Sequence, residues 1–380
     1  MNRRNFFKTG AVAAAATSLG STTAIAKPHK GGNKPGTNPL PRWRGFNLMA
    51  FFTHSSTNEQ YRNRKLEETD LKWIRDWGFD YVRLPFSYWH FVDGSWKTTG
   101  KMDPADIRNL DEEALEQLDK AVEQCVDYGL HITVNMHRAP GYCINNWELE
   151  PFNLFKEREA EDAFAFFWDM LAKRYKGISN KSLSFNLVNE APRINEKMSK
   201  GDYRRVMLRA RDAIHAVSPK RTIIIDGTGV GREVVYNMLG ENVAQAFHAY
   251  DPFHLTHYKA HWAKGSDEWK VPEYPYPYDD GTVMDRRHLA IEMAPWAELV
   301  RQGTGVHCGE CGCYNKTPHK VFLRWFEDVL DLLKQNDIGW GLWNFRGNFG
   351  ILDSGRTDVD YKNWHGHKLD RKLLNLLRKY

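Results

Sequence analysis

The feature that most constrains the fold of this 380-residue chain is a regular alternation of short apolar runs with longer segments of helical periodicity. The eight strand-like runs are Trp43–Leu48, Tyr81–Pro85, His131–His137, Leu183–Glu190, Thr222–Asp226, Val243–Tyr250, Gly305–Glu310 and Gly339–Phe345. The predicted helices include Arg62–Trp77, Asp111–Tyr128, Glu157–Tyr175, Tyr203–Val217, His288–Arg301, Val321–Gln335 and Lys368–Lys379. Parallel strands need a connection of a dozen or more residues, and eight strands close a (β/α)8 barrel. We therefore predict an α/β fold with a single (β/α)8 TIM barrel.

The loops that follow the strands of a barrel are where its binding site forms. Two of these loops are long, Phe86–Leu110 and Asp251–Asp285. Both carry clustered aromatic residues, namely Tyr88, Trp89 and Trp96 in the first and Trp262, Trp269, Tyr274, Tyr276 and Tyr278 in the second. Aromatic rings offer flat apolar faces on which sugars stack, so these residues are either walls of a cleft or plain core packing.

An open, doubly wound sheet is the alternative fold, and it binds ligands beside a glycine-rich turn. The chain has one such turn after a strand-like run, at 227–231, but its glycines lack the G-x-G-x-x-G spacing. A dinucleotide-binding protein is therefore the weaker interpretation.

The N-terminal residues 1–26 have the composition of a processed export signal. A basic start is followed by the small, apolar stretch Ala11–Leu19 and by a small-residue cleavage site at Ala24–Ala26. Arg3 and Arg4 ahead of Phe-Phe-Lys resemble a twin-arginine signal, with an ordinary secretory signal as the alternative. The apolar stretch is too short to span a bilayer. We expect an exported protein, periplasmic or extracellular, with no membrane span.

Residues 27–41 are rich in Gly, Pro, Lys and Asn and predict a flexible linker, which leaves 42–380 for the barrel domain. The formal net charge is +5, and no run of Lys or Arg exceeds what a solvated helix face carries. Nucleic acid and anionic membranes are therefore poor partners. Cys308, Cys311 and Cys313 are closely spaced but lack a recognisable fourth ligand, so we favour buried thiols or one disulfide over a metal site.

Two glutamates end predicted strands and suit the cleavage of a glycosidic bond. That reaction needs one carboxylic acid to protonate the leaving oxygen and one carboxylate to attack or to activate water. Glu190 follows Asn189 at the end of the fourth run, where Pro192 stops further pairing. Glu310 ends the seventh run between glycines that permit close backbone approach. For Glu190, the alternative is a carboxylate that caps the next helix.

Polar or aromatic groups end four further runs: Arg83, His137, His248 with Tyr250, and Trp343 with Asn344. With the two glutamates, six strand ends carry polar or aromatic groups, and core packing alone does not explain all six. Here the chain resembles glycoside hydrolase family 5, the cellulase family, over about residues 42–377. The resemblance is carried by Arg44–Asn47, Val82–Pro85, Val134–His137, Leu187–Glu190, Phe247–Pro252, Gly309–Glu310 and Trp343–Phe345.

The resemblance implies a role for each matching residue. Glu190 is the expected acid/base and Glu310 the nucleophile of a retaining reaction, with carboxyl groups about 5–5.5 Å apart. Arg83 and Tyr250 are expected to hydrogen-bond Glu310 and, by favouring its charged form, to lower its pKa.

Four more residues acquire expected roles from the same resemblance. Asn189 would contact the sugar 2-hydroxyl, His137 and His248 would line the central subsite, and Trp343 would stack under the sugar. Cys311 departs from the family, in which an aromatic residue often follows the nucleophile, so the shape of the neighbouring subsite stays open.

The predicted activity is therefore hydrolysis of a β-linked glucan-type polysaccharide or oligosaccharide, without a cofactor or metal, by a monomer. A β-mannan or another β-glycan is the alternative substrate, and a non-catalytic carbohydrate-binding barrel is the alternative function. Endo and exo action are not distinguished.

Overall fold

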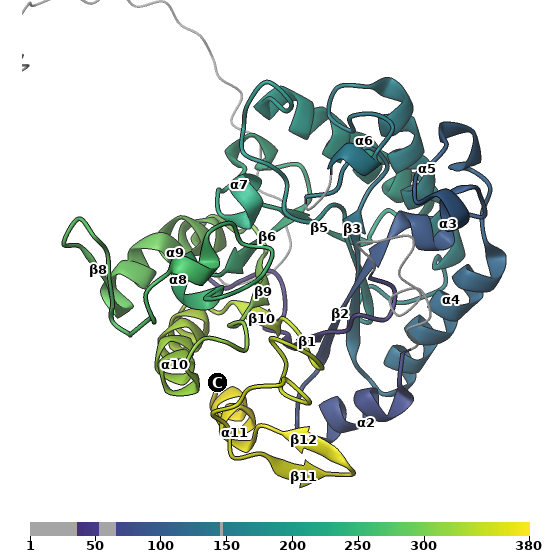
Figure 1. The fold of residues 1–380 in the computed structure, drawn as a ribbon. Helices are drawn as coiled ribbons and strands as arrows, with labels where there is room; N and C mark the ends of the chain where they lie inside the picture. Colours follow the sequence, from purple (N-terminus) through teal and green to yellow (C-terminus); the bar gives the residue numbers. More distant parts are fainter. Residues whose placement is uncertain (1–35, 53–65, 145–146) are drawn as a thin grey trace, which may run out of the picture. The chain divides into compact units, whose positions relative to one another are not determined.

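The computed structural model describes residues 36–52, 66–144 and 147–380. Eight parallel strands form a closed barrel in the order β1-β10-β9-β6-β5-β4-β3-β2, and the helices are arranged around them (Figure 1). The barrel strands are β1 (Arg44–Asn47), β2 (Tyr81–Ser87), β3 (His131–Arg138), β4 (Leu183–Asn186), β5 (Thr222–Asp226), β6 (Ala244–Ala249), β9 (Val306–Cys311) and β10 (Gly339–Leu342). Each falls on one of the eight predicted runs, so the predicted TIM barrel is confirmed.

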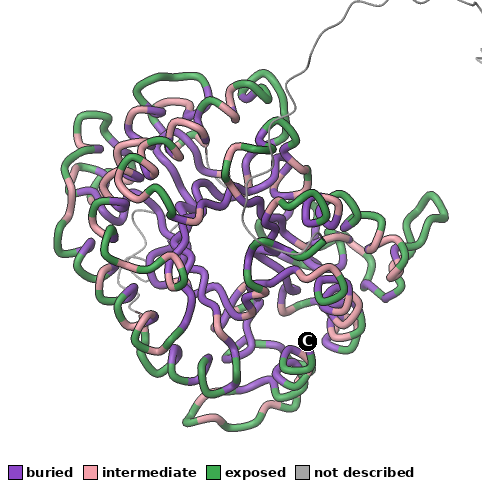
Figure 2. The backbone as a smooth tube through the Cα atoms, turned by 180° about the vertical axis from the view of Figure 1, so that it is seen from behind, coloured by how far each residue is buried: buried purple, intermediate pink, exposed green. Residues whose placement is uncertain are grey.

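The long helices cover the barrel through apolar stripes. They are α2 (Glu68–Asp76), α4 (Glu112–Asp127), α5 (Arg158–Arg174), α6 (Lys200–Val217), α9 (Arg286–Arg301), α10 (His319–Gln335) and α11 (Arg371–Lys379). In α10, Phe322, Phe326, Val329 and Leu333 recur at helical spacing and are all buried. Buried residues accordingly gather in the strands and on the inner sides of the helices (Figure 2).

Polar side chains fix where several of these helices begin. The Asp111 carboxylate accepts a hydrogen bond from the Ala114 amide at the start of α4. Ser199 and Asp202 form a reciprocal capping box at the start of α6. Such caps satisfy amide groups that the first helical turn leaves without a partner.

One crossover departs from the strand–helix alternation. Between β5 and β6 the chain has only the short turn α7 (Thr228–Gly231) and the 3-10 helix η4 (Tyr236–Met238). Gly229, Val230 and Gly231 all have positive φ, a conformation that glycine adopts without steric cost. The glycine-rich turn noted in the sequence therefore forms a tight left-handed bend above the strands.

The two long loops contain short elements of their own. The loop after β2 holds the 3-10 helices η1 (Tyr88–Phe91) and η2 (Pro104–Asp106) and the helix α3 (Trp96–Thr99). The loop after β6 holds α8 (Phe253–Thr256), η5 (Ser266–Glu268) and the paired strands β7 (Tyr276–Pro277) and β8 (Val283–Met284). A further 3-10 helix, η3 (Trp147–Leu149), follows β3.

Two predicted boundaries need correction, and others lie outside the described residues. The predicted linker 27–41 is too long, because Asn38 and Leu40 are buried and the Asn38 amide donates to the Val306 carbonyl at 2.7 Å. Residues 1–35, and with them the predicted cleavage site, lie outside the described residues, as do positions 62–65 of the first predicted helix. The last helix begins only at Arg371, because β11 (Lys362–Trp364) and β12 (His367–Leu369) form a hairpin before it.

No helix within the described ranges is long and apolar enough to cross a membrane.

Candidate active site

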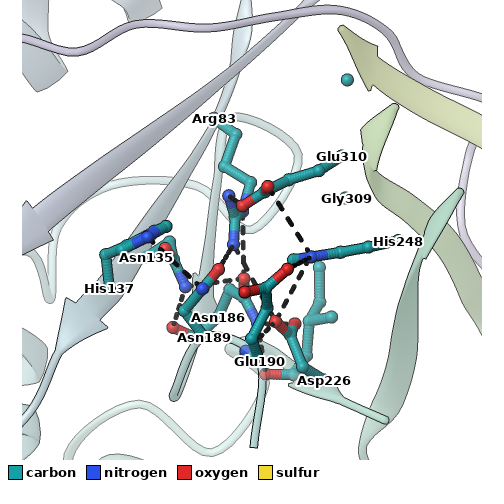
Figure 3. Close-up of polar contacts among 12 residues, drawn as sticks. Arg83, Asn135, His137, Asn186, Asn189, Glu190, Asp226, His248, Gly309 and Glu310 are labelled. Atoms are coloured by element: carbon teal, nitrogen blue, oxygen red, sulfur yellow. Dashed lines mark hydrogen bonds and ion pairs between the residues drawn. The ribbon is translucent and has the colours of Figure 1, made fainter. Parts of the chain in front are cut away.

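Glu190 and Glu310 meet at the carboxyl ends of the barrel strands. Glu190 lies four residues beyond the end of β4, and Glu310 is on β9. One carboxylate oxygen of each, with a ring nitrogen of His248, lies within 4.8 Å of the others. Figure 3 shows the side chains of Glu190, His248 and Glu310 pointing toward one another. The structure thus brings together the two carboxyl groups that the sequence singled out.

A β-bulge in β9 sets the position of Glu310. Phe247 pairs with Cys308 and His248 pairs with Glu310, so Gly309 is the extra residue. A Cβ atom at Gly309 would lie 3.2 Å from His248 Nε2, closer than the imidazole readily permits. Glycine at this position therefore allows the bulge and the histidine to share the space.

Glu310 is buried and accepts two hydrogen bonds. Arg83 Nη1 donates to Oε1 at 2.7 Å, and the Tyr250 hydroxyl donates to Oε2 at 3.0 Å. Both partners are those expected from the sequence. The expected decrease in pKa is wrong, however. Burial raises the pKa of Glu310 above its ordinary value, Glu190 adds to the increase, and His248 and Arg83 oppose it without cancelling it.

His248 is surrounded by three carboxylates. Its Nδ1 lies 2.9 Å from Glu190 Oε1 and 3.7 Å from Glu310 Oε2, and its Nε2 lies 3.3 Å from Asp226 Oδ2. Burial alone lowers the pKa of a histidine, but Glu310 and Asp226 outweigh it and raise the pKa of His248 well above its usual value. The raised pKa favours the protonated ring, which lies between the two glutamates.

Asp226, the last residue of β5, is the main site residue that sequence reasoning missed. It is fully buried, and its carboxylate accepts from the Glu190 amide at 2.9 Å and from Asn186 Nδ2 at 2.8 Å. Glu190 has a φ of 47°, a conformation that non-glycine residues adopt only when their surroundings hold it. The signal was present in the sequence, since Asp226 ends an apolar run as the predicted site residues do.

A layer of asparagines holds the Arg83 guanidinium. Arg83 donates to Asn47 Oδ1 at 2.9 Å, to Asn186 Oδ1 at 3.1 Å and to Asn189 Oδ1 at 2.7 Å. Asn135 Nδ2 in turn donates to Asn186 at 2.8 Å. Of these amides, only Asn189 was singled out from the sequence. A buried charge needs this degree of hydrogen bonding to offset the loss of water.

His137 and Trp343 form an aromatic wall beside the carboxyl pair. Their rings stack with centroids 5.4 Å apart, and Phe52 contacts both edge-on. Asn189 Nδ2 lies 3.4 Å from His137 Nε2. Trp343 is half-buried and follows β10, which ends at Leu342 rather than at Phe345 as predicted.

The three clustered cysteines are buried side chains of β9 and of the loop after it. Cys308, Cys311 and Cys313 are buried, unpaired thiols, which agrees with one of the two expectations and excludes the disulfide. Burial raises the pKa of Cys311, and a hydrogen bond with Cys308 contributes to the increase, so the thiol form of Cys311 is favoured.

In the described part of the chain, the only close set of potential metal ligands is Glu190, His248 and Glu310. The Arg83 guanidinium on Glu310 and the charged imidazole suit a hydrogen-bonded carboxyl pair better than a cation.

Comparisons with known proteins agree with this architecture. Endoglucanase C of Acetivibrio thermocellus is 24% identical over 358 residues, covering 88% of this chain and 97% of that protein. Cellodextrinase A of Ruminococcus flavefaciens is 24% identical over 302 residues, covering 78% of this chain and 83% of that protein. A crystal structure described as a glycoside hydrolase is 36% identical with a TM-score of 0.82, covering 89% of this chain and 99% of that one.

Two family models match the chain. The twin-arginine translocation signal matches residues 1–20, so the chain carries an export signal of the predicted kind. The model for cellulase, glycosyl hydrolase family 5, matches residues 35–349, which include every predicted site residue. The resemblance noted in the sequence is thereby confirmed, and the chain belongs to glycoside hydrolase family 5.

Proposed function

We propose that this exported protein is a retaining hydrolase of β-linked glucans, with Glu310 as the nucleophile and Glu190 as the acid/base. The observation that carries the proposal is the short separation of the two carboxyl groups, whose oxygens lie within 4.8 Å. Retaining enzymes hold these groups about 5–5.5 Å apart, whereas inverting enzymes leave about 6.5–9.5 Å for a water molecule.

The reaction takes place in two steps. A Glu310 oxygen attacks the anomeric carbon while the bond to the leaving oxygen breaks, and Glu190 gives that oxygen its proton. This forms a covalent glycosyl ester on Glu310. Glu190, now ionised, then takes a proton from water, which attacks the same carbon and releases Glu310 and a sugar of unchanged anomeric configuration.

The surrounding residues supply charge and position. Arg83 and Tyr250 aim the Glu310 carboxylate through their 2.7 Å and 3.0 Å hydrogen bonds. His248 lies between the two glutamates and stabilises whichever of them carries negative charge. Trp343 is only half-buried and stacks on His137, which suits a platform under the sugar that is cleaved.

Asn189 and His137 complete the central subsite. The Asn189 carbonyl oxygen accepts from Arg83, which leaves its amide nitrogen, 3.4 Å from His137 Nε2, as the group that would donate to the 2-hydroxyl. Hydrogen bonds to that hydroxyl strengthen in the transition state and accelerate the reaction.

A β-linked glucan is the substrate class we favour. Two relatives are named Endoglucanase C and Cellodextrinase A, after glucans and cellodextrins respectively. A hydrolysis screen on cellulose, mixed-linkage glucan, xyloglucan, mannan and β-1,3-glucan tests this choice. If mannan is hydrolysed fastest, the substrate class is a β-mannan, and the proposed mechanism is unaffected.

The mechanism is tested by proton NMR of the first product. We expect the β-anomer to form first and then to mutarotate, whereas initial release of the α-anomer would mean inversion.

Added azide distinguishes the nucleophile from the acid/base. It should rescue Glu190→Ala on an aryl glycoside and give the β-glycosyl azide. If the β-glycosyl azide forms only with Glu310→Ala, then Glu310 is the acid/base and Glu190 is the nucleophile.

A further inference from the structure

The backbone of Glu190 is in a conformation that its surroundings must support. Its φ of 47° lies in the left-handed region, which a residue with a Cβ atom adopts at a steric cost. The Asp226 carboxylate accepts from the Glu190 amide at 2.9 Å, which fixes the peptide group before Glu190. The peptide group after Glu190 needs a contact of its own, because both planar groups together set the direction in which the side chain leaves the backbone.

Tyr142 supplies that second contact. Its hydroxyl donates to the Glu190 carbonyl oxygen at 2.5 Å. Burial raises the pKa of Tyr142 well above its usual value, and Glu190 adds to the increase, so the hydroxyl keeps the proton that it donates. Tyr142 is completely buried, so it acts on the backbone of Glu190 without reaching a substrate.

The position of Tyr142 is fixed by its own surroundings. Tyr142 and Ala139 exchange two backbone hydrogen bonds of 2.9 Å, which close a tight turn after β3. The Tyr142 ring contacts Trp147 and Phe155 edge-on, with centroids 4.9 Å and 5.4 Å away. A side chain packed in this way has little freedom to turn its hydroxyl away from Glu190.

Glu150 ties this turn to the loop after β2. Its Oε2 atom accepts from the Gly141 amide at 2.9 Å and from the Tyr88 hydroxyl at 2.8 Å. Glu150 is itself buried, and these hydrogen bonds offset part of the cost of removing its carboxyl group from water. Gly141 directly precedes Tyr142, so Glu150 holds the peptide that leads into Tyr142.

The next carbonyl group along the chain is held differently. The Val230 amide, in the left-handed turn after β5, donates to the Ala191 carbonyl at 2.8 Å. That contact joins two backbone groups and persists when a side chain is replaced. Removing the Tyr142 hydroxyl therefore releases the Glu190 carbonyl and leaves its neighbour bound.

We propose that Tyr142 is a positioning residue for the acid/base, and that Glu150 fixes the turn that presents it. The inference rests on the proposed function, in which Glu190 protonates the leaving oxygen, and deepens it by naming the groups that aim that proton. A displaced Glu190 carboxyl group should slow proton transfer and leave the attack by Glu310 unaffected.

The test compares two aryl β-cellobiosides whose leaving groups differ in their need for a proton. Tyr142→Phe removes only the hydroxyl, and kcat/KM for phenyl β-cellobioside should fall about tenfold, as expected for one lost hydrogen bond. Dinitrophenyl β-cellobioside needs little acid assistance, so its kcat/KM should stay nearly unchanged. Glu150→Ala should show the same selectivity, because the turn that carries Tyr142 is then released.

Two further variants serve as references. Tyr274→Phe removes another buried hydroxyl, which donates to Asp328 of α10 at 2.6 Å, and should slow neither substrate. Glu190→Ala should show the same selectivity in a stronger form, because the acid itself is then missing.

The inference is overturned if Tyr142→Phe slows both substrates equally. It is also overturned if that variant slows neither, since a change in melting temperature alone would make Tyr142 a packing residue. A Glu150→Ala protein without the selectivity would remove Glu150 from the positioning. If Glu190→Ala itself lacks the selectivity, the proposed function fails, whatever the result for Tyr142.

Discussion

The two ends of the barrel bury histidines in opposite surroundings. At the amino ends of the strands, His131 stacks on Trp43 with centroids 3.6 Å apart, and His307 packs against Tyr81 at 4.6 Å. Burial lowers the pKa of His131 to about 4 and that of His307 to about 3. At the carboxyl ends, His248 is equally buried, yet Glu310 and Asp226 raise its pKa well above its usual value. Burial alone makes a histidine neutral, and nearby carboxylates reverse that.

Along the same strands, the amino end of the barrel contributes mainly to stability, and the carboxyl end holds the proposed reacting groups. The aromatic end closes the barrel with neutral rings, whose removal should cost stability. The charged end places buried ions close together, which is costly for folding but useful for reaction. If this division holds, either end can be changed without affecting the property that depends on the other.

The largest expected effect comes from the carboxyl pair. Glu310→Gln should lower kcat/KM by about 10⁴-fold or more, because no covalent intermediate can form. Glu190→Gln should lower it by about 10²- to 10⁴-fold on substrates with a poor leaving group. Both proteins should keep the circular dichroism spectrum of the barrel. Near-normal turnover by either folded variant would contradict the assignment.

A matched pair of tryptophans tests the two ends directly. Trp343→Ala should lower kcat/KM by about two orders of magnitude, roughly 3 kcal/mol, with little change in melting temperature. Trp43→Ala, at the aromatic end, should instead cost about 3–5 kcal/mol of stability and spare the specific activity of the folded fraction. Thermal melts and kinetics of both proteins decide whether each tryptophan contributes to activity or to stability. A collapsed melting temperature with near-normal rates for Trp343→Ala would remove its platform role.

Asp226→Asn tests whether a carboxylate keeps His248 charged. Since Asp226 helps to raise the pKa of His248, its removal should lower that pKa toward the neutral range, and the imidazolium is then lost at lower pH. We expect kcat/KM to fall about 10- to 100-fold and its alkaline limb to move to lower pH. A pH profile of unchanged shape would leave Asp226 only a structural role.

Asp370→Asn is the matched control for this change. Asp370 is also buried, lies 2.7 Å from His319 and caps α11, away from the candidate site. Its loss should lower the melting temperature and leave the pH profile of kcat/KM unshifted.

The smallest effect concerns the pH dependence of stability at the aromatic end. The folded-state pKa of His307 is about 3, below its unfolded value near 6.5. Between these values only the unfolded chain takes up the proton, so the free energy of unfolding decreases as pH falls, by up to about 1.4 kcal/mol per pH unit. His307→Gln should make this dependence shallower in denaturant titrations between pH 6 and 4. Equal slopes would mean that His307 does not remain neutral when folded.

The strands, and the two glutamates that the structure brings together, could be predicted because both leave a one-dimensional signature. Apolar runs mark buried strands, and Glu190 and Glu310 interrupt such runs at their ends. The charge state of the site could not be predicted in the same way. The pKa of Glu310 was expected to be lowered by its two hydrogen bonds, but its complete burial outweighs them.

Other features depend on contacts between distant segments. The bond between Asn38 and Val306 joins residues 268 positions apart, so a Gly- and Pro-rich composition gave no sign that Asn38 is fixed. Asn47 and Asn186 became recognisable as site residues only once both were seen to bind Arg83.

The most direct test of the central claim is to trap the glycosyl ester. A 2-deoxy-2-fluoro-β-glycoside with a good leaving group slows the second step more than the first, so the intermediate accumulates. Mass spectrometry of the intact protein should show one added fluorosugar, and peptide mapping should place it on Glu310. A label on Glu190, or an enzyme that hydrolyses glucan yet never carries the sugar, would contradict the account.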